Sequence, residues 1–424
     1  MKRIVLIFLF ANLFLSAIVL FKSPFEFYIG YIAYLFLPYF FFKYGPPRYA
    51  LIVFTVLFVV GFIFVQLGLN TFSQLVKVTM GFFLSVAFFE FVVKIYDGDV
   101  SSLFKFYMKS AFVVSAIGIM QVVTQRVGFS PGYNFGWLLN KWGVIYAEGG
   151  GIRMNSLFSE PSYYSSTMAP AFFVGLYNVV NRKNPMFITL RQSLVVVLAY
   201  PLTQSGVGMF GILISILLLV INSGFLRYSF LIGPILAFGF NYAYDNNEEF
   251  RSRVDSTFEI YNTGNIYSYD IHGSSFVLYN HTHIATENFK ENPIFGTGLG
   301  SHETAFDRFS LTNMSGVVDI EFNKADANSM ALRLMSETGI VGLLFFGYFF
   351  LSNWVLKGWT LKDEYWVISN ACFLIIALQL LRQGNYFYCG FPFFLWLYYY
   401  TKNANARDKR GVVKDKFKFQ INAK

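Results

Sequence analysis

Six charged side chains stand beside long apolar runs of this sequence, and their chemistry suits an anionic ligand. They are Arg153, Glu160, Arg253, Asp326, Arg333 and Arg382. An ionised side chain within a membrane-crossing run costs at least ~2.5 kcal/mol, so each needs a partner or a function. Guanidinium groups grip phosphate or carboxylate through two parallel hydrogen bonds. As a group, with Glu160 adjacent, these residues predict an anion-binding site.

The same residues also admit a purely structural interpretation. Pro161 suits the first turn of a helix, where its missing N–H costs nothing, and Glu160 before it lies favourably at the positive end of the helix dipole. Each arginine can equally pair with a loop carboxylate or a lipid phosphate. Both interpretations stay open at the level of single residues.

The elements that must position these side chains are membrane-crossing helices. The chain has 424 residues, of which 55% are hydrophobic and 13% are charged, and its mean hydropathy is +0.48. Ordinary soluble domains of this length do not combine such values. Because one crossing needs ~20 apolar residues, we predict an all-α integral membrane protein with about twelve transmembrane helices. The predicted crossings are 4–21, 27–43, 49–67, 75–93, 106–124, 161–180, 187–203, 205–222, 225–243, 328–352, 365–381 and 385–400.

Basic residues predict the orientation, because Lys and Arg near the crossings stay in the cytoplasm. With the N-terminus inside, the inner turns hold Lys43, Lys94 and Lys357, and the C-terminus also lies inside. The predicted organisation is N-terminal helices in 1–124, an outer loop in 125–160, central helices in 161–243, a large outer loop in 244–327, C-terminal helices in 328–400 and a basic tail in 401–424.

Other classes of site are not indicated. Cys372 and Cys389 fall inside predicted crossings, so we expect neither to form a disulfide or bind a metal. All four histidines lie within 244–327, but no third ligand follows at a familiar zinc spacing. The sequence contains no phosphate-cradling P-loop and no Gly-x-Ser-x-Gly elbow. We expect no metal and no cofactor, and the basic tail suits anionic lipid better than nucleic acid.

Three separated stretches resemble motifs of the O-antigen polymerase and ligase superfamily, integral membrane enzymes that handle undecaprenyl-diphosphate-linked sugars. The first is Arg153 followed by "FSEPS" at 158–162, the second is "ENPIFGTGLGSH" at 291–302, and the third is "ADANSMALRLMSETGIVGLLFF" at 325–346. Where ligases of the superfamily carry a His before the Asn, this chain has Ala327 before Asn328. This departure favours a polymerase over a ligase.

The resemblance implies a GT-C-like architecture with a periplasmic loop domain, in the inner membrane of a bacterium. It implies a metal-independent glycosyltransferase that joins undecaprenyl-diphosphate-linked repeat units, with the lipid bilayer and a chain-length regulator protein as further partners. In that reaction the first candidate for the general base is Glu160 and the second is Asp326, with Arg153 beside them. The expected substrate-binding residues are Arg253, Arg333, Arg382, Tyr163, Asn328 and Tyr386. An O-antigen ligase is the nearest alternative, and a polysaccharide flippase or transporter is the second.

Overall fold

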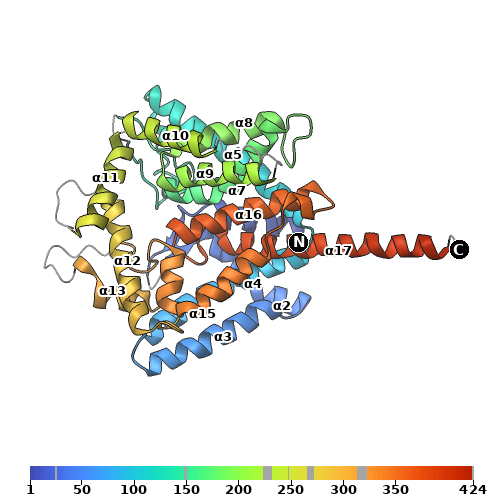
Figure 1. The fold of residues 1–424 in the computed structure, drawn as a ribbon, viewed down its shortest axis with the longest axis horizontal. Coiled ribbons are helices and arrows are strands. Elements are labelled where there is room, and N and C mark those ends of the chain that lie inside the picture. The colour runs from blue at the N-terminus through green and yellow to red at the C-terminus, as the bar shows by residue number, and fades with distance from the viewer. Residues whose placement is uncertain are drawn as a thin grey trace.

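The computed structural model describes residues 1–23, 26–147, 150–222, 232–246, 248–264, 272–312 and 322–422. This part of the chain is mostly helical, with sixteen α-helices and one short two-stranded sheet (Figure 1). The helices are α1 Lys2–Phe14, α2 Leu37–Tyr44, α3 Arg48–Gln66, α4 Phe72–Ile95, α5 Val100–Arg126, α6 Ser130–Tyr133, α7 Pro161–Val180, α8 Leu190–Ala199, α9 Gly206–Asn222, α10 Ile232–Asn246, α11 Glu248–Thr263, α12 Gly273–Glu291, α13 His302–Phe309, α15 Met330–Ser352, α16 Asp363–Arg382 and α17 Phe391–Asn422.

Five of the described helices are long and apolar enough to cross a membrane, as expected of a multi-pass membrane protein. They are α3, α4, α5, α15 and α16. The exposed face of α3 consists of residues such as Ile52, Val56 and Ile63, and that of α15 includes Phe345 and Tyr348. Large apolar side chains on the outside of a helix are stable only where the surroundings are apolar too.

Other predicted crossings take a different form in the structure. The run 4–21 is not one helix, because α1 ends at Phe14 and the chain continues into strand β1 Val19–Phe21, which pairs antiparallel with β2 Phe27–Tyr28. The run 27–43 divides into the 3-10 helix η1 Ile29–Phe36 and α2. The start of the predicted crossing 225–243 lies outside the described residues. Hydropathy alone could not detect these breaks, since the broken segments are themselves apolar.

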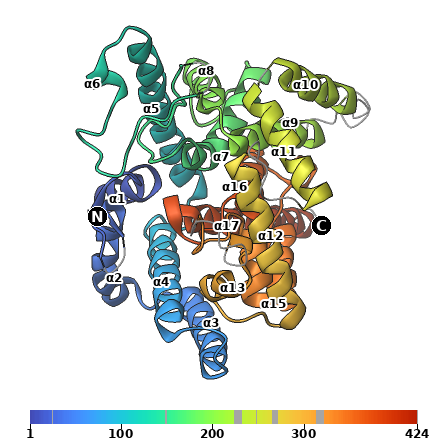
Figure 2. The ribbon, with the colours of Figure 1, turned by 90° about the vertical axis from the view of Figure 1, so that its left-hand side faces the viewer.

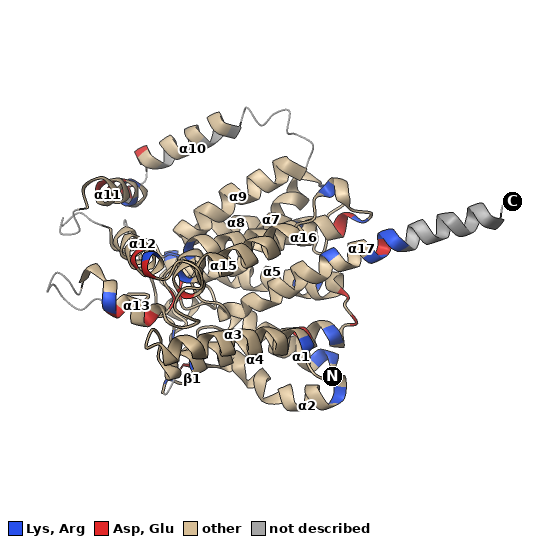
Figure 3. Ribbon diagram, turned by 60° about the horizontal axis from the view of Figure 1, so that its bottom comes forward, with Lys and Arg blue, Asp and Glu red and all other residues tan. Residues whose placement is uncertain are grey.

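The segment 244–327, which we predicted as a polar loop, contains much regular structure. It holds α11, α12 and α13, three polar helices. These helices lie together at one end of the molecule, away from the C-terminus (Figure 1), and they lie in front of α16 and α17 when that end faces the viewer (Figure 2). Ribbon positions of Lys and Arg gather at the opposite end, around the N-terminus and along α17 (Figure 3). The basic residues after 400 continue α17 without a break.

The helices α7 and α16 form the centre of the core, and α7 begins and ends where predicted. Pro170 lies inside α7 and cannot donate a helical hydrogen bond. The Tyr107 hydroxyl of α5 contacts the α7 backbone on both sides of this proline. It donates to the Thr167 carbonyl at 2.7 Å and accepts from the Ala171 N–H at 3.2 Å. Cys372 in α16 and Cys389 are both buried free thiols, as predicted.

Candidate functional site

The helix α15 is broken at Gly339, and the break organises the end of the molecule that carries the predicted site. Gly339 has φ 59° and ψ −156°, which no α-helical residue adopts. The segment before α13 enters the break: the Ile340 N–H donates to the Pro293 carbonyl at 2.9 Å, and the Gly298 N–H donates to the Glu337 carbonyl at 2.8 Å. Non-helical backbone at membrane depth needs such internal partners.

Two glycines make this close approach geometrically feasible. A Cβ on Gly296 would lie 2.5 Å from the Glu337 carbonyl carbon, and one on Gly339 would lie 2.6 Å from the Ile294 carbonyl oxygen. Both residues also have a positive φ, which glycine adopts without strain. The motifs at 291–302 and 325–346, separate in the sequence, therefore form one packed unit.

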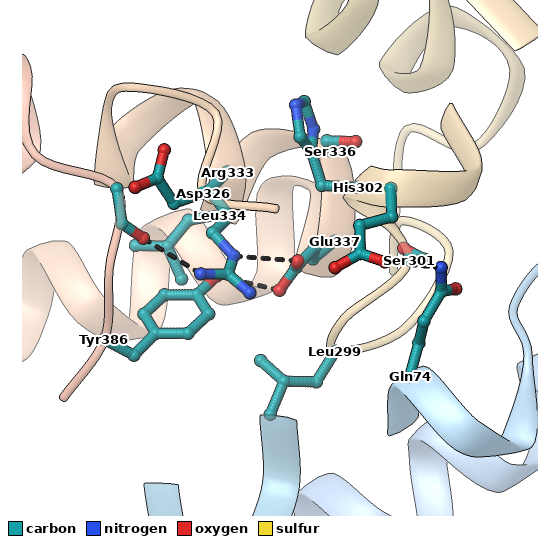
Figure 4. A network of polar contacts seen from close by, with 12 residues as sticks. Gln74, Leu299, Ser301, His302, Asp326, Arg333, Leu334, Ser336, Glu337 and Tyr386 are labelled. Atoms are coloured by element: carbon teal, nitrogen blue, oxygen red, sulfur yellow. Dashed lines mark hydrogen bonds and ion pairs between the residues drawn. The ribbon is translucent and has the colours of Figure 1, made fainter. Parts of the chain in front are cut away.

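A buried ion pair lies in the first half of the broken helix (Figure 4). The Arg333 Nε lies 2.9 Å from the Glu337 carboxylate, and Arg333 Nη1 donates to the Gly384 carbonyl at 3.1 Å. The Tyr386 hydroxyl donates to the other Glu337 oxygen at 2.9 Å, and the Tyr386 ring lies under the guanidinium at 4.2 Å. Arg333 and Glu337 are only 4% and 0% exposed. Arg333 and Tyr386, which we predicted to contact substrate, are therefore engaged in hydrogen bonds and an ion pair with other groups of the protein.

Glu337 is the residue of this network that the sequence analysis missed. A signal was present, because Arg333 and Glu337 stand four residues apart in a run that reads as a helix. Side chains at this spacing are neighbours on one helix face. The pairing with Tyr386 and Gly384 had no comparable signal, since these residues follow a different helix.

The turn that carries Asp326 is strained and firmly held. Ala327 and Asn328 have φ values of 58° and 55°, in the left-handed region that costs a non-glycine residue about 1–3 kcal/mol. The Asn328 N–H and the Asn323 side chain both donate to Asp326 Oδ1 at 3.0 Å. Among the described residues, no hydrogen bond reaches Oδ2. Gly384 packs directly on the Asp326 carbonyl, where a side chain would not fit.

Glu160 and Asp326, the two predicted general bases, both act electrostatically on the Tyr163 hydroxyl. The Tyr163 ring packs on Tyr388 at 4.6 Å, which ties the start of α7 to the chain before α17. Glu160 occupies the N-cap position before Pro161 without capping the backbone; its exposed side chain accepts a hydrogen bond from Ser162 at 3.0 Å. Glu160 therefore lies at the positive end of the α7 dipole with Pro161 in the first turn, as the structural interpretation expects, but its side chain does not cap the backbone.

Two of the predicted arginines, Arg253 of α11 and Arg382 at the end of α16, act on each other electrostatically. Arg382 is half-buried, and within the described ranges no hydrogen bond or ion pair engages its guanidinium. Arg253 contacts His272 at 3.2 Å. A cavity of about 200 Å³ opens beside it, lined also by Phe250 and by residues of the turn before α9 such as Thr203, Gln204 and Ser205.

Arg153 is positioned through its backbone. Its N–H donates to the Ile145 carbonyl at 2.8 Å, next to the isolated bridge between Tyr146 and Ile152. Its side chain is half-buried.

Comparison with known proteins adds no family assignment: no protein-family model matches the chain, and no curated protein matches it. The chemistry of the site must then be judged from its own residues. They provide two carboxylates around Tyr163 and two neighbouring cations, Arg253 and Arg382, at the same end of the helices. This arrangement can bind an anionic group and take a proton from a hydroxyl group.

Proposed function

We propose that the chain is a membrane-embedded glycosyltransferase that joins undecaprenyl-diphosphate-linked oligosaccharide repeat units into an O-antigen-type surface polysaccharide. The observation that carries the proposal is Arg382: its side chain is half-buried, Arg253 acts on it electrostatically, and no acidic side chain within the described part of the chain pairs with it. A half-buried guanidinium without such a partner strongly favours an anion beside it. A lipid diphosphate supplies two adjacent phosphates that match two such forks.

In the proposed reaction, the bond between the donor sugar and the diphosphate breaks while an acceptor hydroxyl forms a new bond to that sugar. The diphosphate leaves with the bonding electrons, and Arg253 and Arg382 stabilise its growing negative charge. The hydroxyl proton passes to Asp326 or Glu160. Asp326 Oδ2 is well suited to accept it, because the two hydrogen bonds from Asn323 and Asn328 both use Oδ1.

The proposal includes a finer topology. It has about twelve crossings, cytoplasmic termini, and the site with 244–327 on the periplasmic face of a bacterial inner membrane. The basic side chains at the end around the N-terminus support this orientation (Figure 3). The five long apolar helices support the membrane location. Donor and acceptor are both lipid-linked glycans, and a chain-length regulator would act as a separate partner.

An O-antigen ligase is the second candidate, and Ala327 before Asn328 is the residue that speaks against it. Loss of a polymerase leaves single repeat units on the cell surface, whereas loss of a ligase leaves long glycan on the lipid carrier. A flippase or transporter is the third candidate. Elongation of lipid-linked repeats by purified protein in detergent, where no gradient exists, would exclude transport as the sole activity.

Arg382→Ala is expected to lower the rate of repeat-unit elongation by about 10²–10³-fold, because one cation facing the leaving diphosphate is lost. The measurement is glycan chain length after incubation of purified protein with lipid-linked repeats. Arg251→Ala is the matched control, since this neighbour of Arg253 on α11 donates to the Tyr244 and Asp245 carbonyls and should leave elongation unchanged. Long chains from the Arg382 variant would refute the diphosphate site.

Asp326→Asn and Glu160→Gln test the general base. Each change keeps the side-chain size and removes the negative charge, and the one that removes the base should slow elongation by about 10²–10⁴-fold. Asparagine at 326 can still accept the hydrogen bonds from Asn323 and Asn328, so the turn should persist. Near-normal rates in both variants, with normal amounts of protein in the membrane, would reject both carboxylates as bases.

A further inference from the structure

Two histidines form a buried hydrogen-bonded pair between the polar helices. His281 lies on α12 and His302 is the first residue of α13. His281 Nδ1 lies 3.0 Å from His302 Nε2, and His281 Nε2 lies 2.9 Å from the Phe322 carbonyl oxygen. Both side chains are 0% exposed. The pair thus joins α12 and α13 to the turn that leads from Phe322 to Asp326.

The contacts fix the protons of the two neutral rings. A carbonyl oxygen can only accept, so His281 Nε2 carries a proton that it donates to Phe322. His281 Nδ1 is then an acceptor, and His302 Nε2–H donates to it. His302 Nδ1 is left as a lone pair, and this buried atom has no hydrogen-bond partner among the described residues.

An additional proton has no satisfactory place in this pair. The contact with Phe322 requires one proton, and the contact between the rings has room for one proton only. A third proton must therefore reside on His302 Nδ1, whichever ring carries the charge. A buried donor without an acceptor is unfavourable, and the added charge is also opposed electrostatically by the Arg333 guanidinium.

The charged groups around the pair come from α13 itself, from the turn before α15 and from α15. Arg333 of α15 acts electrostatically on His302, with Glu337 as its ion-pair partner. Asp326 acts electrostatically on His281. The ion pair of Lys324 with Asp307 completes the set, with the Lys324 ammonium group 5.8 Å from the Phe306 ring, which itself packs on His281. Of these groups only Asp326 and the acidic partners of the ion pairs oppose the added charge.

We propose that His281 and His302 are positioning residues that hold the Asp326 turn against the helices while both rings are neutral, and release it when a proton enters the pair. The physical reason is that only the neutral pair satisfies all of its buried contacts. The release of the turn at low pH is inferred from the structure alone. Its effect on catalysis, loss of the Asp326 carboxylate from the site, rests on the proposed function.

The direction of the pH dependence follows from burial. Burial lowers the pKa of His281 and lowers the pKa of His302 well below the usual value of about 6.5. The released state has exposed rings that bind protons below that value, whereas the closed state does not. The turn is therefore held above about pH 6.5, and its closing equilibrium weakens by up to about tenfold per pH unit for each ring as the pH falls.

The test uses Ala327→Cys as a reporter in the full chain, in detergent. Ala327 is 0% exposed, so a maleimide reaches a thiol there only after the turn has moved. We expect the labelling rate, divided by that of a free thiol at the same pH, to rise at least tenfold between pH 7 and pH 5.5. With His281→Gln and His302→Gln present as well, the rate should no longer depend on pH. The native Cys372 and Cys389 are buried and report global unfolding.

His283→Gln is the matched control, because this second histidine of α12 lies outside the pair and its loss should leave the labelling profile unchanged. Hydrogen exchange of residues 322–330 in the unmodified chain provides the same measurement without the reporter. A labelling profile that is flat in the parent, or equally steep without the two histidines, overturns the proposal. If the labelling profile depends on pH but the protein elongates no glycan, the role of the histidine pair in holding the turn stands and the proposed function is rejected instead.

Discussion

Glu337→Ala is expected to destabilise the folded protein by about 3–5 kcal/mol, because it leaves the Arg333 charge buried without its partner. Both side chains are almost fully inaccessible to solvent, and the Tyr386 hydroxyl would lose its acceptor as well. The measurement is the thermal midpoint of the purified protein in detergent. It is read from the loss of the monodisperse size-exclusion peak after heating to a series of temperatures. Little folded protein should remain in the membrane fraction at growth temperature.

The companion change separates the charge effect from the loss of packing. Arg333→Met combined with Glu337→Leu removes both charges and keeps the apolar volume, so the double variant should be more stable than Glu337→Ala alone. The remaining cost comes from the Gly384 carbonyl and the Tyr386 hydroxyl, which lose their partners. A double variant as unstable as the single one would mean that the charges themselves contribute little, contrary to our account of the network.

Gly384→Ala is expected to abolish elongation while most of the protein stays folded. An added Cβ would overlap the carbonyl oxygen of Asp326, so the turn that presents the carboxylate must move. The turn already carries two consecutive non-glycine residues with positive φ, Ala327 and Asn328, and has little freedom to adjust. A displacement of about 1 Å from the reactive geometry can cost about 10²-fold in rate.

Gly347→Ala is the control for this change. Gly347 lies in the second half of α15, where an added Cβ meets no atom within 4 Å. Alanine also favours the helix by roughly 1 kcal/mol over glycine at an exposed position. Equal elongation rates in the two alanine variants would show that the contact between Gly384 and Asp326 does not position the reactive carboxylate.

Much of the local helical structure was predictable from hydropathy and end signals. The crossing predicted at 49–67 is α3, and the one predicted at 161–180 begins with the proline that starts α7. These predictions succeeded because apolar length and an N-terminal proline act within one turn or one helix. The prediction for 4–21 failed because the strand pair of β1 with β2 depends on a partner strand that hydropathy cannot indicate.

The candidate site was predictable only in part. The residue types and their neighbourhood to helix ends indicated Asp326, Arg253 and Arg382, and the structure brings the two arginines together from segments far apart in the chain. The same reasoning treated Arg333 as equivalent to them, yet Glu337 neutralises it four residues later. In the sequence, an arginine whose charge is paired with a ligand cannot be told from one whose charge is paired with another side chain.

The sequence by itself indicated a mostly helical chain with several helices long and apolar enough to cross a membrane, because composition and periodicity act locally. Only the tertiary structure decided which charged side chains are internally paired and which face one another. It also decided that α15 breaks at Gly339 and that His281 meets His302. These outcomes depend on backbones approaching within contact distance, and no pattern along one segment contains the position of another.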